Sequence, residues 1–222
     1  MITLADIEAE ERRRRTNRID GFFPDHGDLR RELYSAHTEF FAAGAKYRTR
    51  VFLAANRVGK TIAGSYESAC HLTGEYPKWW VGKRFKTPIK AWAVGLTGKT
   101  TRDSIQTEML GEPSSPGTGM IRASLLRDTT PKAGVPRAVD SAYVEHISGG
   151  VSKIVFKSSD QGREAFQAES VQVIWIDEEA DESVYEECLI RTATVGGIVT
   201  LTFTPLLGVT PLVQKFLPQG EE

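Results

Sequence analysis

One short stretch of the sequence combines the residue types that bind nucleotide phosphates. Val51-Phe52-Leu53 is predicted as a buried strand, and Gly59-Lys60-Thr61 opens a stretch that is predicted as a helix. In such a turn the backbone N–H groups and the helix N-terminus face an anion, the lysine reaches the β- and γ-phosphates, and the threonine hydroxyl binds Mg²⁺. The pattern is a variant of the P-loop, because Ala54 stands where glycine is usual. The predicted nucleotide-binding residues are Ala55, Asn56, Arg57, Val58, Gly59, Lys60 and Thr61.

A second stretch, residues 93–100, fits the same relaxed pattern, and the segments that follow separate the two. After Thr61 the residues are mostly small or apolar, as in a helix packed against a sheet. After Thr100 they are mostly polar with a narrow apolar stripe, as in a surface helix. The first stretch is therefore predicted to bind the nucleotide, and Lys99 to be an ordinary loop lysine before a helix.

Two carboxylates follow another apolar run. Residues 171–176 are almost all apolar, and Asp177 and Glu178 come directly after them. A central parallel strand that is buried on both faces has this composition and carries its last side chains to the carboxyl edge of the sheet. Asp177 is predicted to hold Mg²⁺ through water, and Glu178 to act as general base on the attacking water. Strand ends commonly carry acids before a turn, so the motif is strong only because a P-loop precedes it.

Two further segments offer side chains to the same site. Residues 198–203 form another buried-looking strand, and Thr202 and Thr204 are predicted at its tip as γ-phosphate sensors, the alternative being plain β-propensity. Residues 29–41 are predicted as a helix directly before the P-loop strand. Its Tyr34 and His37 either pack in the core or bind the adenine base, and the sequence leaves both possibilities open.

Composition limits the class of protein. The chain of 222 residues is long enough for one large domain, and 40% hydrophobic with 26% charged residues excludes disorder of the whole chain. The net charge of -1 does not favour nucleic acid, so any DNA contact requires a local patch. Cys70 and Cys188 indicate neither a disulfide framework nor a metal site. No apolar run reaches the roughly 18–20 residues that span a bilayer, and the N-terminus is unlike a secretion signal, so an intracellular protein is expected.

The remaining segments carry no predicted chemistry. Residues 6–18 are predicted as a solvated helix with ion pairs between Glu8 and Arg12, Glu10 and Arg14, and Glu11 and Arg15; a DNA-contacting arm is the alternative. Residues 111–140 are rich in glycine and proline and are predicted as loop. Residues 142–147 and 152–157 alternate around Ser148-Gly149-Gly150 and are predicted as a β-hairpin or two neighbouring strands.

Together these stretches resemble the ATPase domain of the large terminase subunit, the DNA-packaging motor of tailed bacteriophages. The resemblance covers about residues 22–216. It rests on the P-loop stretch at 52–61, Phe156-Lys157-Ser158 with Gly162-Arg163, Trp175-Ile176-Asp177-Glu178-Glu179, and Leu201-Thr202-Phe203-Thr204-Pro205. The combination is specific, whereas any one of these motifs is not.

The resemblance implies a role for each motif. Lys60 and Thr61 would bind phosphates and Mg²⁺, Asp177 would be the Mg²⁺ carboxylate, and Glu178 the catalytic base. The family keeps an arginine inside its P-loop, in many members one position earlier, where Asn56 stands here, so Arg57 is the catalytic candidate. The family's coupling motif, which links hydrolysis to motion, would comprise Thr202, Phe203 and Thr204.

The implied fold is α/β, an ASCE-type P-loop NTPase with a mostly parallel central sheet, helices on both faces and the nucleotide at the carboxyl edge. The implied function is Mg²⁺-dependent ATP hydrolysis that drives double-stranded viral DNA into a prohead, in the cytoplasm of an infected bacterial host. The implied partners are the DNA, the portal protein of the prohead, the small terminase subunit and further copies of the chain in a ring. Alternatives are another P-loop DNA motor such as a helicase, or a regulatory nucleotide-binding module without turnover, against which Glu178 beside Asp177 argues.

The resemblance also sets an expected domain organisation. Family members carry a C-terminal RNase H-like nuclease, and this chain stops at Glu222, just after the coupling motif. Residues 1–20 are expected to form a charged helix or arm, and residues 21–222 the ATPase domain alone, largely monomeric in isolation. Ring motors often take an arginine from the neighbouring subunit, and the candidates for such a group are Arg102, Arg127, Arg163 and Arg191.

Overall fold

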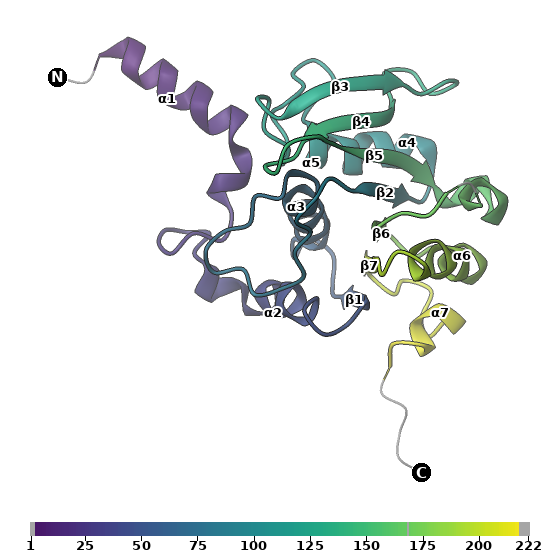
Figure 1. The fold of residues 1–222 in the computed structure, drawn as a ribbon. Helices are drawn as coiled ribbons and strands as arrows, with labels where there is room; N and C mark the ends of the chain where they lie inside the picture. Colours follow the sequence, from purple (N-terminus) through teal and green to yellow (C-terminus); the bar gives the residue numbers. More distant parts are fainter. Residues whose placement is uncertain (1–2, 168, 218–222) are drawn as a thin grey trace.

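A seven-stranded sheet forms the centre of the computed structural model, which describes residues 3–167 and 169–217 (Figure 1). The strand order is β1-β7-β6-β2-β5-β4-β3. The first five strands in this order are parallel, and β4 and β3 continue the sheet antiparallel. The strands are β1 (Thr49–Leu53), β2 (Lys90–Gly95), β3 (Leu126–Pro131), β4 (Val139–Glu145), β5 (Val151–Ser158), β6 (Val173–Asp177) and β7 (Ile198–Phe203).

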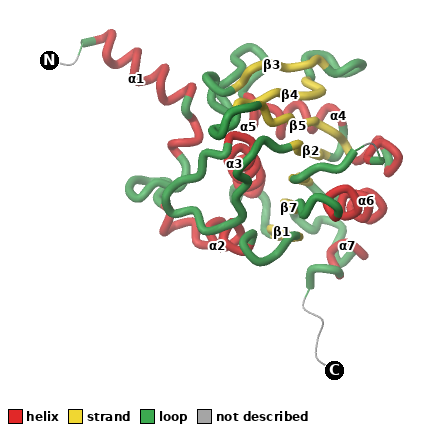
Figure 2. The backbone as a smooth tube through the Cα atoms, viewed as in Figure 1, coloured by secondary structure: helices red, strands yellow, loops and turns green. Residues whose placement is uncertain are grey.

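The helices are mostly short, and the segment between α3 and β2 is loop throughout (Figure 2). A π-helical segment, Thr101–Gln106, joins α4 to α5, so that residues 98–110 form one continuous helical stretch. Short 3₁₀ turns stand at Arg18–Gly21, Arg31–Tyr34, Ser159–Gln161 and Arg163–Phe166. The α-helices are α1 (Leu4–Thr16), α2 (Ser35–Ala43), α3 (Lys60–Thr73), α4 (Gly98–Thr100), α5 (Thr107–Leu110), α6 (Glu182–Ala193) and α7 (Pro211–Gln214).

Helices cover both faces of the sheet, as the alternation of side chains in β6 makes plain. Val173 and Trp175 belong to the hydrophobic cluster that includes residues of α2 and α3. Ile174 and Ile176, which point the other way, belong to the cluster that includes residues of α6 and α7. All five residues of β6 are buried. The predicted α/β fold with helices on both faces is therefore confirmed.

Helix α3 lies very close to the sheet. Its residues from Ala63 to Thr73 are buried, as the small and apolar residues after Thr61 predict. At Gly64 an added Cβ would stand 2.1 Å from the indole of Trp175. A glycine at this position lets the helix approach the central strand, and it fixes the distance between the turn before α3 and the end of β6.

Two sequence predictions outside the centre are partly wrong. Residues 111–140 are not only loop, because they include the edge strand β3, which pairs with β4. Its sequence, Leu-Arg-Asp-Thr-Thr-Pro, has no apolar alternation because both of its faces are largely exposed, so only pairing with β4 defines it. The predicted helix over residues 29–41 begins as a 3₁₀ turn and becomes α-helical only at Ser35. The hairpin of β4 and β5 is confirmed.

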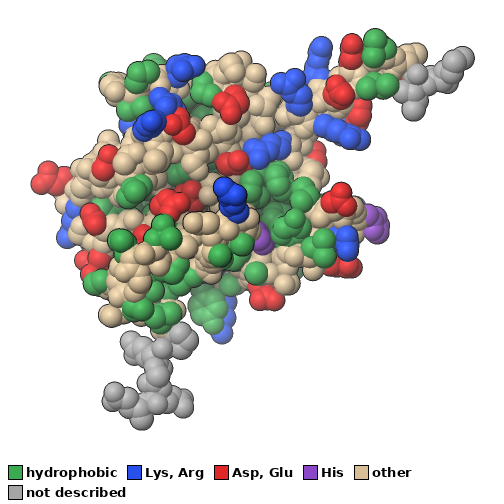
Figure 3. Space-filling view, turned by 180° about the vertical axis from the view of Figure 1, so that it is seen from behind, with side chains coloured by type: hydrophobic (Ala, Val, Ile, Leu, Met, Phe, Trp, Pro, Cys, Tyr) green, Lys and Arg blue, Asp and Glu red, His purple; other side chains and the backbone are tan. Residues whose placement is uncertain are grey.

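Helix α1 has no buried residue and extends away from the sheet (Figure 1). It begins with a capping box formed by Thr3 and Asp6, and Glu10 pairs with Arg13 at 2.7 Å and Arg14 at 2.8 Å. In the face seen in Figure 3 this arm carries side chains of both charges. The solvated helix is therefore confirmed, although the ion pairs found in the described residues do not include the ones predicted from Glu8 and Glu11.

Two further expectations concern the whole chain. Among the described residues, no helix is long and apolar enough to cross a membrane. Cys70 in α3 and Cys188 in α6 are both buried and unbonded.

Candidate functional site

Three neighbouring parallel strands end at the same edge of the sheet and gather residues that lie far apart in the sequence. In the sheet register Leu53 of β1 is opposite Phe203 of β7, and Asp177 of β6 is opposite Thr202 of β7. The turn before α3 follows β1 directly. Because carboxyl ends of parallel strands form the usual ligand site of an open α/β sheet, this edge is the candidate site.

The turn between β1 and α3 presents a lysine at the first helical position. Gly59 precedes α3 with a φ of 85°, a left-handed conformation that glycine adopts without strain. Lys60 is buried, and its Nζ donates to the carbonyl of Ala55 at 2.7 Å and to the hydroxyl of Thr204 at 2.8 Å. The ammonium group is thus held by neutral oxygens of the turn and of the β7 tip, where a phosphate could replace them.

A carboxylate and two hydroxyls meet beside this lysine. Thr61 donates to Oδ2 of Asp177 at 3.0 Å, and Thr202 donates to Oδ1 of Asp177 at 2.6 Å. Asp177 is only 4% exposed, and this burial raises its pKa to about 6, against the lowering effect of the two hydroxyl bonds. A buried carboxylate that is costly to ionise is stabilised by a cation, so the position favours a metal ion.

The oxygen donors fit Mg²⁺. This ion is usually bound by one or two carboxylates together with substrate phosphates and water, and Thr61 and Asp177 supply a hydroxyl and a carboxylate 3.0 Å apart. In the part of the chain that the structure describes, no cluster of three or more His, Cys, Asp or Glu side chains could hold a metal by itself. Thr61 and Asp177 could therefore hold such an ion together with further ligands, such as substrate phosphates or water.

Two residues of this edge have strained backbone conformations. Arg57 has a φ of 65° and Glu178 a φ of 80°, values that non-glycine residues rarely adopt. Glu178 is exposed, and its backbone N–H donates to the carbonyl of Thr202 at 3.0 Å. The next carboxylate, Glu179, accepts a hydrogen bond from the hydroxyl of Thr210 instead. Strain of about 1–3 kcal/mol per residue persists where the surroundings require it, and it concentrates at functional sites.

A cavity of about 300 Å³ adjoins the turn. It is lined by Arg57, Val58 and Gly59 of the turn and by Tyr34 and His37. His37 is 6% exposed, and burial lowers its pKa, so that its imidazole is neutral at pH 7. Its ring lies edge-on to the ring of Phe52. Tyr34 and His37 therefore contact the aromatic core and also line a cavity next to the turn. Both possibilities for these residues, core packing and binding of the adenine base, stay open.

The coupling residues Thr202, Phe203 and Thr204 occupy three different environments. Thr204 lies at the strand tip beside Lys60. Thr202 is 1% exposed, and its hydroxyl donates to Asp177; its role as a γ-phosphate sensor stays a prediction. Phe203 is buried in the cluster on the α6 side. The contact between Trp175 Nε1 and Thr202 Oγ1, 2.7 Å apart, was not predicted from the sequence. A tryptophan within an otherwise aliphatic strand is the feature that could have indicated it.

The second stretch that fits the phosphate-binding pattern has another structure. Lys99 is exposed and lies in the first turn after β2, where Thr97 and Thr100 form a capping box with each other. The following apolar stripe, with Ile105 and Met109, is buried against the sheet. The hydroxyl oxygens of Thr97 and Thr100 each accept from the other's backbone N–H, which a bound phosphate would otherwise use.

Comparison with known proteins gives the family of the chain and supports its fold. Residues 51–222 match the family model described as terminase large subunit, T4likevirus-type, N-terminal. The chain belongs to this family. It is 36% identical to the large terminase subunit of Salmonella phage P22 over 95% of its own length and 44% of the relative's. A solved large terminase from the thermophilic bacteriophage D6E is similar with a TM-score of 0.50 at 12% identity, covering 73% of this chain and 34% of that one, and it supports the fold. The chain thus spans less than half the length of both relatives.

The four arginines considered for a neighbouring subunit's site all have local partners in this terminase-family fold. Arg163 and Arg191 both pair with the buried Glu187, at 2.9 and 2.8 Å. Arg127 pairs with Glu145 at 2.9 Å, and Arg102 with Asp103 at 2.6 Å. The local salt bridges expected as an alternative for Arg163 and Arg191 are therefore present.

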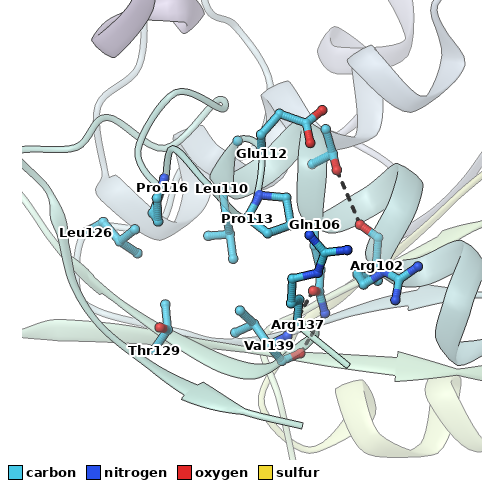
Figure 4. Close-up of a pocket in the computed structure, with 12 residues that line it drawn as sticks. Arg102, Gln106, Leu110, Glu112, Pro113, Pro116, Leu126, Thr129, Arg137 and Val139 are labelled. Carbon is cyan, nitrogen blue, oxygen red and sulfur yellow. Dashed lines mark hydrogen bonds between the residues drawn. The ribbon is translucent and has the colours of Figure 1, made fainter. Parts of the chain in front are cut away.

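A second cavity, of about 220 Å³, lies between the π-helical stretch and strands β3 and β4 (Figure 4). Its lining is largely apolar, with Leu110, Leu126 and Val139 among the residues that face it, and the guanidinium of Arg137 stands near its rim. Gln106 at its wall donates to and accepts from the backbone of Val139. None of the residues of the turn between β1 and α3 lines it, so it is separate from the candidate site.

Proposed function

We propose that this chain binds Mg²⁺-ATP at the carboxyl edge of β1, β6 and β7 and hydrolyses it. The observation that carries the proposal is the convergence of Lys60, Thr61 and Asp177 from two distant segments, with Glu178 directly after the carboxylate. These groups supply a cation for the phosphates, oxygen ligands for the metal and a base for the water.

Each residue has a distinct task in this proposal. Lys60 would leave its neutral oxygen partners and bind the β- and γ-phosphates. Thr61 and Asp177 would hold Mg²⁺, which neutralises the charge of the phosphates. Glu178, exposed and fixed by its backbone bond to β7, would orient water and accept its proton. Arg57, exposed on the turn, would stabilise the charge that develops on the γ-phosphate.

The cavity between the turn and α2 would take the base. Tyr34 and His37 line it together with residues of the turn, and a neutral imidazole can stack on adenine or hydrogen-bond to it. Thr204, in contact with Lys60, would report the occupancy of the phosphate site to β7. The coupling of hydrolysis to movement would begin at this contact.

Membership of the large terminase family supports a wider role. We infer that hydrolysis powers the translocation of double-stranded viral DNA into a prohead, with several copies assembled on the portal protein, the small terminase subunit as a partner, and the host cytoplasm as the location. The net charge of -1 and the mixed charges of α1 indicate that DNA contact would use a local surface rather than the whole chain.

Replacing the proposed base gives the sharpest test of turnover. Glu178→Gln keeps the size of the side chain but removes the base, so ATP binding should be retained while turnover falls by about 10²-fold or more. Glu179→Gln is the matched control, because the Glu179 carboxylate already accepts a hydrogen bond from Thr210. This substitution should leave turnover nearly unchanged. Wild-type turnover in the Glu178→Gln protein, or loss of turnover only in the control, would remove Glu178 from the mechanism.

A further inference from the structure

Trp175 is a fully buried residue that contacts both elements beside the candidate metal site. It lies in the middle of β6 with 0% exposure. Its ring faces α3 at Gly64, where an added Cβ would stand 2.1 Å away, and its Nε1 donates to the hydroxyl of Thr202 in β7 at 2.7 Å. One side chain thus joins the helix that carries Thr61 to the strand that carries Thr202.

The direction of the hydrogen bonds around Thr202 is fixed by the chemistry of the donors. An indole nitrogen only donates, so the oxygen of Thr202 must accept from Trp175. A hydroxyl has a single hydrogen, and in this arrangement it is left for Oδ1 of Asp177, 2.6 Å away. The three side chains are 0%, 1% and 4% exposed, so water does not compete strongly for these bonds. Two hydrogen bonds in series, called the relay below, therefore connect Trp175 through Thr202 to Asp177.

We propose that Trp175 is a positioning residue for the metal-binding carboxylate: its N–H holds the Thr202 hydroxyl in the one orientation that fixes Asp177. The inference rests on the function proposed above. Without the indole N–H, the threonine hydroxyl could rotate and donate elsewhere, and Asp177 would lose the constraint on Oδ1. Groups that orient a metal ligand in this way typically change metal affinity by about 10- to 100-fold when they are removed.

The test measures metal binding rather than turnover. Mn²⁺ replaces Mg²⁺, and its affinity for the protein with ADP is measured by electron paramagnetic resonance. Trp175→Phe and Thr202→Val should each weaken Mn²⁺ binding by about tenfold or more, whereas Thr202→Ser, which keeps the hydroxyl, should bind as the wild type does. Thr200→Val is the matched control, because Thr200 is buried on the same strand and bonds only to the carbonyl of Ile174.

A double mutant separates the relay from simple packing. If the N–H acts through Thr202, Trp175→Phe should add less than about twofold to the loss in the Thr202→Val background. Effects that multiply, or normal Mn²⁺ affinity in Trp175→Phe, would overturn the proposal and leave Trp175 as a packing residue. Should Trp175→Phe fail to fold, benzothienylalanine at position 175 keeps the ring shape and replaces the N–H by sulfur, with the same expected loss.

The outcome also distinguishes this inference from the proposed function. If the wild type itself shows no Mn²⁺-dependent ADP binding, the proposed nucleotide site is wrong. If the wild type binds and the Trp175 and Thr202 variants bind equally well, the site stands and only the relay fails.

Discussion

The buried carboxylate of Asp177 should make the nucleotide-free protein less stable above pH 6 than it would be without the charge. Burial raises the pKa of this group to about 6 from its ordinary value of 3.8. A group whose pKa is higher in the folded state stabilises the fold while it is protonated, and this contribution is lost as the pH rises through about 4 to 6. At about 1.4 kcal/mol per pKa unit, the loss reaches about 3 kcal/mol at pH 8.

Asp177→Asn removes the charge and keeps both the shape and a carbonyl oxygen for the Thr202 hydroxyl. Without nucleotide and with EDTA present, this variant should therefore be more stable than the wild type by up to about 3 kcal/mol at pH 8, with a difference below about 1 kcal/mol at pH 4. Urea unfolding at the two pH values measures the difference. Asp160→Asn, in an exposed turn, is the control and should show no such pH dependence.

An Asp177→Asn protein that is less stable than the wild type at pH 8, or equally more stable at both pH values, would refute the reasoning. Addition of Mg²⁺-ATP should reverse the order, because only the wild type gains from binding the ion. The free energy of unfolding that the wild type loses by burying the charged carboxylate would then be regained by binding Mg²⁺-ATP.

Three further variants test other parts of the structure. Glu67→Ala leaves the guanidinium of Arg50, 4% exposed, without its carboxylate and should cost about 3–5 kcal/mol in urea unfolding; a cost below 1 kcal/mol would mean that water reaches the pair. Gly64→Ala should cost about 1–3 kcal/mol because of the indole beside it, whereas Gly21→Ala, with no atom within 4 Å of an added Cβ, should melt with the wild type. Arg57→Ala should retain ATP affinity and lose most of the turnover; unchanged turnover would transfer the charge-stabilising role to another arginine.

The sequence was sufficient to predict the parallel centre of the fold, and the residues of the candidate site lie together at one edge of it. β1 ends in the apolar residues Val51-Phe52-Leu53, and β6 and β7 are buried along their whole length. Polar or glycine-containing segments follow each strand, and the carboxyl ends of parallel strands meet at one edge of the sheet. The choice between the two phosphate-binding patterns also came from composition and stays a prediction; it was based on the small residues, such as Gly64, that follow the first pattern and let a helix pack against the sheet.

The orientation of individual side chains could not be predicted in the same way. Thr202 faces Asp177 because the sheet register places the two opposite each other, and register is a property of strand pairing rather than of either strand alone. The contact of Trp175 with Gly64 joins residues more than 100 positions apart in the sequence. Strand β3 has an exposed, polar sequence, and only its partner β4 makes it a strand.

The central claim is that the turn after β1, and not the similar stretch after β2, binds the nucleotide. Titration of a fluorescent ATP analogue with Mg²⁺ into Lys60→Ala and Lys99→Ala compares the two directly. Because Lys60 is buried at the site and Lys99 is exposed within α4, Lys60→Ala should bind at least about tenfold more weakly than the wild type, and Lys99→Ala within about twofold of it. Weak binding by Lys99→Ala with normal binding by Lys60→Ala would contradict the account.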